Sequence, residues 1–195
     1  MRNKLAILIL LILFIVSISC VSAEDSNSVS VLSGSNSDVY VSPTGNDNNV
    51  GDVNNPFATI NKAIDSNVSN IHLSEGKFIG TGNNGLTIEN KSITIIGAGA
   101  DKTIIDLNKT QFMDIKSTSS VVLTNLTIIN GYTKYGGAIY NNGNLTIQNC
   151  NFKNTTFTNV SFLKSNINDT DFSNCTFDYC TFQSSNFIIL PLKIM

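Results

Sequence analysis

Charged side chains are scarce in this sequence. They make up 13% of the 195 residues, against roughly 25% in an average soluble protein. Arg2 is the single arginine, and the formal net charge is −2. Because no basic patch exists to hold a phosphate backbone, the sequence argues against a nucleic-acid partner.

Histidine and cysteine are also scarce. His72, the single histidine, cannot build a histidine cluster, and we expect it at a strand surface. Cys20 lies in an N-terminal apolar segment, and the other cysteines, Cys150, Cys175 and Cys180, are an odd number late in the chain. A disulfide framework usually has an even number, spread along the chain. We therefore predict no disulfide scaffold and expect Cys175 and Cys180 to fill small core positions.

The N-terminal residues 1–23 are typical of a secretory signal peptide. Arg2 and Lys4 form a positive region, residues 5–16 are an unbroken apolar run, and small residues lead up to Ala23. The run is too short for a comfortable membrane span, and no later segment is apolar enough to be one. We expect cleavage after Ala23 and a secreted, cell-surface or cell-wall location.

Three further expectations concern the ends of the chain. Cys20 offers an alternative N-terminal lipid site, although residues 17–19 match a lipobox poorly. Residues 24–37 are rich in Ser and Asn and are expected to form a flexible leader. Residues 190–195 form a tail that leaves the pattern of the preceding residues.

Short strands separated by turn residues are predicted through the middle of the chain. The predicted strands are 39–42, 71–73, 85–88, 92–96, 103–107, 121–123 and 126–129, with a turn at 75–76. The five-residue motif at 86–90 (LTIEN) recurs at 126–130 (LTIIN) and 145–149 (LTIQN), and this repetition indicates a solenoid. Local hairpins at 84–85, 130–131 and 142–143 are an alternative, but they do not explain the repeated motif.

One helix of about ten residues is predicted near the start. Asn55 is a suitable N-cap and Pro56 suits the first helical position. The apolar positions share one face: Phe57, Ile60, Ala63 and Ile64.

The last third of the chain has a five-residue period. Large apolar residues recur at 147, 152, 157, 162, 167, 172, 177, 182 and 187, and small ones precede them by two positions from Cys150 to Ser185. Neither a helix nor a hairpin has this period. A square coil does, with one unit on each side, its large residue inward, and about twenty residues per coil, so that coils stack like parallel strands.

Several stretches resemble known β-helix families. Residues 40–47 (YVSPTGND), 55–60 (NPFATI), 71–78 (IHLSEGKF), 93–97 (ITIIG) and 103–106 (TIID) resemble pectate-lyase-like proteins. Residues 135–141 (YGGAIYN) resemble the Gly-Gly-Ala-Ile repeat of surface adhesins, including adhesin-like proteins of methanogenic archaea, and residues 150–187 are similar to pentapeptide-repeat proteins. The resemblance implies an all-β, right-handed parallel β-helix with a short capping helix. Its expected parts are a pectate-lyase-like β-helix at 38–149 and pentapeptide-repeat-like coils at 150–189.

The same resemblance raises the question of a catalytic site. Polysaccharide lyases of this fold imply a basic side chain that abstracts a proton, with Ca²⁺ held by acidic residues, and related hydrolases use paired or tripled Asp. Lys102 or Lys116 would have to replace arginine, beside Asp101, Asp106 and Asp114. However, the pair 101–102 is more typical of a solvated turn before the next strand.

Two other groups of polar residues are candidate sites. The loop residues Asn46, Asp47, Asn48 and Asp52 are oxygen donors of the kind Ca²⁺ prefers, but they lack the full spacing of a calcium loop, so a polar turn is the simpler interpretation. Asn-x-Ser/Thr sequons, candidates for glycosylation, occur at Asn67, Asn90, Asn108, Asn125, Asn144, Asn154, Asn159, Asn168 and Asn174. Stacked Asn and Thr at turns can instead form hydrogen-bonded ladders between coils.

These features favour a secreted adhesin-like protein that binds a polysaccharide or protein ligand at the cell surface through a long polar β-helix face. Two alternatives stay open. One is a polysaccharide lyase or hydrolase of the pectate-lyase-like fold, with bound Ca²⁺ as the conceivable cofactor. The other is an incomplete piece of a larger structural surface protein.

Overall fold

The computed structural model describes residues 38–133, 138–158, 166–168, 170–172, 175–178 and 186–188. The predicted signal peptide 1–23, with Cys20, lies outside these residues, as do the leader 24–37 and the tail 190–195. Within the described part of the chain, no helix is long and apolar enough to cross a membrane.

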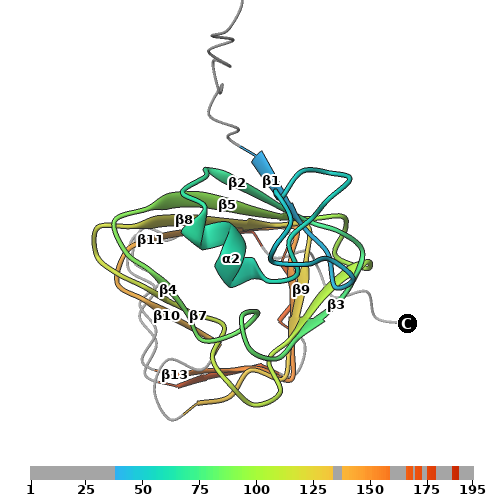
Figure 1. Cartoon of the computed structure of the whole chain (residues 1–195). Coiled ribbons are helices and arrows are strands. Elements are labelled where there is room, and N and C mark those ends of the chain that lie inside the picture. Colours follow the sequence, from blue (N-terminus) through green and yellow to red (C-terminus); the bar gives the residue numbers. More distant parts are fainter. Residues whose placement is uncertain are drawn as a thin grey trace, which may run out of the picture. The chain divides into compact units, whose positions relative to one another are not determined.

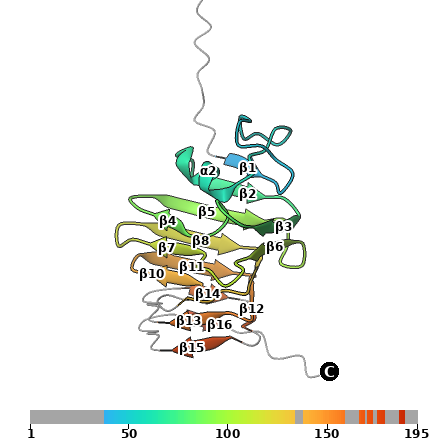
Figure 2. The ribbon, with the colours of Figure 1, turned by 60° about the horizontal axis from the view of Figure 1, so that its bottom comes forward.

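The described chain winds into stacked coils whose sides form parallel β-sheets (Figures 1 and 2). Sheet A has seven strands, in the order β1 (Asp38–Val41), β2 (Asn70–Leu73), β5 (Ser92–Gly97), β8 (Ser120–Thr124), β11 (Asn144–Gln148), β14 (Asn166–Asn168) and β16 (Asn186–Ile188). Sheet B contains β3 (Gly76–Ile79), β6 (Thr103–Asp106), β9 (Thr127–Ile129) and β12 (Asn151–Lys153). Sheet C contains β4 (Leu86–Ile88), β7 (Met113–Ile115) and β10 (Ile139–Asn141), and a further pair is β13 (Thr156–Thr158) with β15 (Thr176–Asp178).

Neighbouring strands are one coil apart in the chain, and every pairing between the described strands is parallel. The predicted all-β parallel β-helix is therefore confirmed. The alternative of local hairpins is wrong, because each turn carries the chain onto a different sheet instead of back along the same one.

Coil length is uneven in the first coils, starting with the 32 positions between Val39 and Ile71, and is constant in the last two. Ile71 pairs with Ile95, 24 positions later, and Ile95 pairs with Leu123, 28 positions later. The next partner, Ile147, follows after 24 positions. The last two steps, to 167 and then 187, are 20 positions each. Twenty residues are four sides of five, so the register confirms the square coil that the five-residue period predicts.

The core is the column of side chains that point into the coils. On sheet A the stacked residues Ile71, Ile95, Leu123, Ile147 and Ile167 are fully buried. Strands β5, β8 and β11 alternate buried positions with partly or fully exposed ones, as a sheet with one solvated face does. Burial of this column is the main favourable term that holds the coils together.

The five-residue pattern places its large and small residues inward, as predicted. Large residues Ile147, Phe152, Phe157 and Ile167, and small residues Cys150, Thr155 and Thr170, are all buried. Phe172 is only partly buried, and Phe177 is 38% exposed. The predicted positions Val160, Phe162, Ser165, Cys180, Phe182 and Ser185, and the side chain of Phe187, lie outside the described residues.

The helix is shorter than predicted. Helix α2 spans Ile60–Asp65, and its N-cap is Thr59, whose hydroxyl accepts a hydrogen bond from the Lys62 N–H. The predicted cap at Asn55 is wrong, because Phe57 is drawn into a parallel bridge with β1 and stays extended. Its N–H donates to the Tyr40 carbonyl at 2.9 Å. The predicted apolar face is nevertheless buried, and the helix covers the open end of the first coils (Figure 1).

The repeated five-residue motif (LTIEN, LTIIN and LTIQN) does not mark one fixed side of each coil, as the solenoid interpretation suggests. Its three copies lie on three different sheets, in β4, β9 and β11. The final residue of each copy, Asn90, Asn130 or Asn149, has a positive φ of 50–58°. Asn tolerates this left-handed conformation better than most residues. The motif therefore indicates a strand followed by a corner, and it can occur on any side of the coil.

Three strands were not predicted. β3 begins at Gly76, where the sequence predicts a turn, while β7 and β10 are only three residues long. They become strands because the neighbouring coils present hydrogen-bonding edges at the same level.

Truncating the inward column should destabilise the solenoid. Replacing Ile95 by Ala leaves a cavity in a fully buried site, and we expect the free energy of unfolding to fall by about 2–5 kcal/mol. Thr94→Ala, on the solvent side of the same strand, should cost about 1 kcal/mol or less. Urea denaturation of both variants checks this, and equal losses would contradict the inward assignment.

Candidate functional site

A surface hollow beside Asp106 collects polar side chains from three successive coils. Its volume is about 660 Å³, and it is lined by Asp106, Asn108, Lys109, Asn130, Tyr132 and Asn154. These residues end or follow β6, β9 and β12, which are neighbours in sheet B. Because parallel strands end at the same edge of a sheet, the stacking of coils brings these corners together.

The carboxylate of Asp106 is the anchor of the hollow. One oxygen, Oδ2, lies 2.7 Å from the Lys77 ammonium of the preceding coil. The other, Oδ1, accepts hydrogen bonds from the side-chain amide of Asn130 at 2.9 Å and from the Asn108 N–H at 3.1 Å. The Asp106 side chain is only 9% exposed. A nearly buried carboxylate thus has three donors from three coils, as a buried charge requires.

These contacts fix the charge state of Asp106. Burial acts to raise the pKa of the carboxyl, but the hydrogen bonds from Lys77, Asn130 and the Asn108 backbone outweigh it and hold the pKa below its ordinary value. Asp106 is therefore ionised at neutral pH. It is an orienting group that holds the Asn130 amide in place.

The residues at the rim of the hollow are exposed and can contact a ligand. Tyr132 is 60% exposed, and Asn108, Lys109 and Asn154 are also exposed. Within the described residues, neither the Lys109 ammonium nor the side-chain amides of Asn108 and Asn154 have a hydrogen-bond partner. The rim therefore offers one aromatic ring, two amides and one cation around an ordered floor.

The other catalytic candidates lie elsewhere. Asp101 and Lys102 are exposed in the turn before β6, as the turn interpretation predicts. Asp114 lies on β7 of sheet C, where its Oδ2 is 2.6 Å from the Lys116 ammonium. The hydrogen bond and charge of Asp114 raise the pKa of Lys116, which keeps this amine protonated at neutral pH and so unavailable to accept a proton as a general base. The five candidates are thus divided among one turn and two sheets.

The oxygen-rich loop uses its side chains to fold itself. Asp47 Oδ1 accepts from the Ala58 and Thr59 N–H groups at 2.8 and 2.9 Å, and Asp47 Oδ2 accepts from the Thr59 hydroxyl. Asp52 Oδ1 accepts from two backbone N–H groups, of Asn54 and Asn55.

The same loop offers little to a cation. Asn46 Oδ1 likewise accepts from the Asn48 N–H at 2.9 Å, so this side chain also closes a turn. Across the described ranges, no group of three or more His, Cys, Asp or Glu side chains is placed to hold a metal ion. The geometry favours the interpretation of a polar turn.

Comparison with known proteins bears on the C-terminal coils. The family model of pentapeptide repeats matches residues 144–174, in eight copies. This segment is a run of pentapeptide repeats. No curated protein matches the sequence.

Among solved structures, a rhamnogalacturonan lyase resembles the chain with a TM-score of 0.40 and 16% sequence identity. The similarity covers 73% of this chain and 50% of that one, so the chain spans about half the length of that structure.

Two cysteines of the later coils lie at small-residue positions. Cys150, in the pentapeptide-repeat segment, is buried, and Cys175, just after it, is half-buried. Burial raises the pKa of each thiol to about 11. Neither is a thiolate at neutral pH, which suits core filling and not nucleophilic chemistry. Cys180 lies outside the described residues.

The sequon asparagines lie mainly at corners. Positive φ values occur at Asn67, Asn90, Asn108, Asn125 and Asn154, and Asn144 opens β11. Asn159 and Asn174, and the side chain of Asn168, lie outside the described residues. One rung of the expected ladder is present, since the Asn149 amide donates to Asn125 Oδ1 at 2.6 Å. Sequence reasoning did not identify Lys77, Asn130 or Tyr132, because no local motif links them to Asp106.

Acidification should weaken the fold through Asp106. Since its pKa is lower in the folded chain, its stabilising contribution is complete above its ordinary pKa and is lost as pH falls through the folded-state pKa. Asp106→Asn should therefore cost about 1–3 kcal/mol near pH 7 and progressively less in acid. Asp101→Asn, at the exposed turn, should change stability by about 0.5 kcal/mol or less. Urea unfolding from pH 7 to pH 2 checks this, and a constant difference would contradict it.

The Cys150 thiol should be protected in the folded chain. At pH 8 its raised pKa and its burial should slow alkylation by iodoacetamide at least about a hundredfold relative to the urea-unfolded chain. Mass spectrometry of the peptide that contains Cys150 measures this rate. Equal labelling before and after unfolding would place the thiol at the surface.

Proposed function

We propose that this chain is a secreted, adhesin-like cell-surface protein that binds glycans, with the hollow beside Asp106 as its principal contact. The single observation that carries the proposal is the composition of that hollow. Exposed Tyr132, the amides of Asn108 and Asn154 and the Lys109 ammonium surround a floor that Asp106 and Asn130 hold rigid.

This chemistry matches a sugar ring. A side-chain amide has two N–H donors and a carbonyl acceptor, so one asparagine can pair with neighbouring sugar hydroxyls directly or through water. An exposed tyrosine ring can cover the apolar C–H face of a pyranose, with its hydroxyl free to bond at the rim. Hollows lined by a few fixed polar groups and an aromatic ring are common binding sites.

Binding is favoured over polymer cleavage by the state of Asp106. A general acid needs a raised pKa, whereas the contacts from Lys77, Asn130 and Asn108 lower the pKa of Asp106. Among the described residues that line the hollow, Asp106 is also the single carboxylate. The paired carboxylates of a hydrolase are therefore not found among these described residues.

Export is inferred from the signal-like residues 1–23. The low charge and the repeat architecture of the chain fit a surface protein that makes many weak contacts with a polymer. The solenoid supplies the length for such contacts, because every coil presents corners at the same edge.

The test combines retention with polymer size. The purified chain, produced without glycosylation so that Asn108 and Asn154 are bare, is incubated with acidic and neutral polysaccharides in the presence of Ca²⁺. Polymer should be retained at its original length. Tyr132→Ala should weaken retention about tenfold or more, equivalent to about 1.4 kcal/mol.

The matched control is Tyr140→Ala, which removes an outward tyrosine from sheet C and should leave retention unchanged. Shortened polymer would overturn the binding proposal in favour of the lyase or hydrolase alternative. Equal retention by the wild type and Tyr132→Ala would remove the hollow from the proposal.

A further inference from the structure

The outer face of sheet A differs from the other faces in charge. Nine outward positions on β5, β8 and β11 carry no ionisable group: Ser92, Thr94, Ile96, Ser120, Val122, Thr124, Asn144, Thr146 and Gln148. In contrast, sheet B has Lys77 and Lys153 on its outer face, and sheet C has Asp114. The face of sheet A is thus uncharged across β5, β8 and β11, and its outward ionisable groups, Asp38 and His72, lie at its N-terminal end on β1 and β2.

These neutral side chains form straight rows along the coil stack. Ser120 lies between Ser92 and Asn144, Val122 between Thr94 and Thr146, and Thr124 between Ile96 and Gln148. Neighbouring parallel strands are about 4.8 Å apart, so each row repeats its groups at that spacing. The face is a regular array of hydroxyls, amides and methyl groups.

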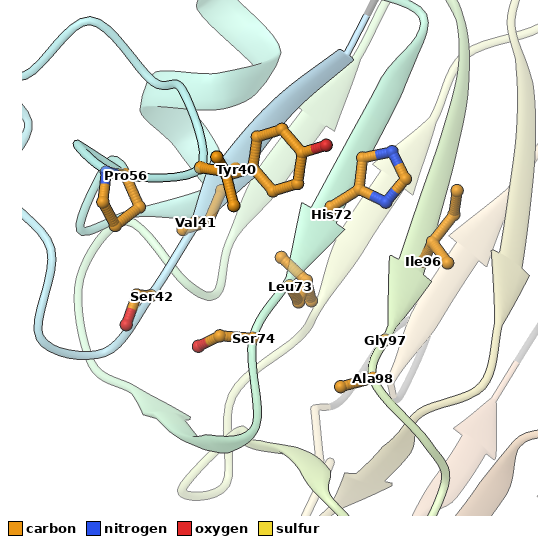
Figure 3. A pocket seen from close by; sticks show the side chains of 11 residues that line it. Tyr40, Val41, Ser42, Pro56, His72, Leu73, Ser74, Ile96, Gly97 and Ala98 are labelled. Atoms are coloured by element: carbon orange, nitrogen blue, oxygen red, sulfur yellow. The ribbon is translucent and has the colours of Figure 1, made fainter.

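One of these rows leads into a groove at the N-terminal end of the face. Tyr40 pairs in register with His72, and His72 with Ile96, so the row continues across β1, β2 and β5. Figure 3 shows these side chains next to one another on successive strands. The Tyr40 and His72 rings stack with centroids 5.0 Å apart and planes 19° apart.

The groove has an apolar floor and a polar edge. Its volume is about 420 Å³, and Val53 and Pro56 from the loop before α2 close one side. Polar atoms come from the Tyr40 hydroxyl, the His72 ring and the hydroxyls of Ser42 and Ser74 (Figure 3). A ligand with one apolar face and hydroxyls at its rim matches this lining.

A carboxylate next to the groove argues against an anionic ligand. Asp38 Oδ1 lies 3.8 Å from His72 Nε2 and accepts a hydrogen bond from the Asn70 amide at 2.6 Å. The Asp38 side chain is 44% exposed, so its negative charge faces solvent beside the stacked rings. It would repel the carboxylate of an acidic sugar, and no cation on the nine outward positions would offset that repulsion.

We infer that the outer face of sheet A is a second glycan contact that selects neutral, extended polysaccharides. The groove at Tyr40 and His72 takes the apolar face of one sugar ring, and the neutral rows on β5, β8 and β11 bind the units that follow. The inference rests on the proposed function, because it takes the ligand to be a glycan. It adds a separate surface and a charge preference.

The experiment uses the full chain carrying Tyr132→Ala, which disables the hollow beside Asp106. The probes are hydroxyethyl cellulose and carboxymethyl cellulose, which share a backbone and differ in charge. Retention on the neutral polymer should exceed retention on the carboxylated one about tenfold or more. Adding Tyr40→Ala should remove most of that retention, whereas adding Tyr140→Ala, on sheet C, should not change it.

A second variant keeps the test independent of any folding defect at Tyr40. Thr146→Lys places a cation in the middle of the neutral face, at an outward strand position that tolerates a long side chain. It should raise retention of carboxymethyl cellulose severalfold and reverse part of the selectivity. The inference is overturned if Tyr40→Ala leaves retention of the neutral polymer unchanged, or if both polymers are retained equally.

The two proposals fail in different ways. If the wild type binds glycans through Tyr132 while Tyr40→Ala has no effect, this inference alone is wrong. If the wild type retains no glycan at all, the proposed function fails, and this inference fails with it.

Discussion

The structure depends on apolar side chains stacked in register between one coil and the next. A single coil cannot bury its inward residues alone, so the burial of Ile71, Ile95, Leu123 and Ile147 requires their counterparts above and below. The parallel ladders satisfy the backbone at the same time. The register survives even though the steps between paired residues of sheet A range from 32 positions, from Val39 to Ile71, down to 20, from Ile147 to Ile167. The extra residues are therefore accommodated at corners and loops.

This constraint also governs the surface. On each side of the solenoid, equivalent positions of successive coils lie one above the other. A chemical property that these positions share, such as lack of charge, therefore continues along the stack. Sheet A keeps neutral outward groups on β5, β8 and β11, while sheets B and C hold the ion pairs of Asp106 and Asp114. Asp106 can be nearly buried only because Lys77 and Asn130, one coil to either side, supply donors. The hollow is a consequence of coil stacking.

Much of the fold can be predicted from the sequence, because the inward positions recur at fixed spacing. The five-residue period predicted the burial of Phe152 and Phe157 and the twenty-residue coil. The helix was misplaced because its start depends on a contact distant in sequence, the bridge of Phe57 to Val41, which overrides the local preference of Asn55 and Pro56.

The candidate site was only partly predictable. The sequence by itself determined the all-β solenoid, the inward residues and the corner asparagines, since each of these follows from local periodicity or backbone preference. The tertiary structure alone decided that Lys77 and Asn130 meet Asp106, and that Tyr40 stacks on His72. Those pairs depend on how many residues each coil contains, because one residue more or less would turn a side chain to the other face of its sheet.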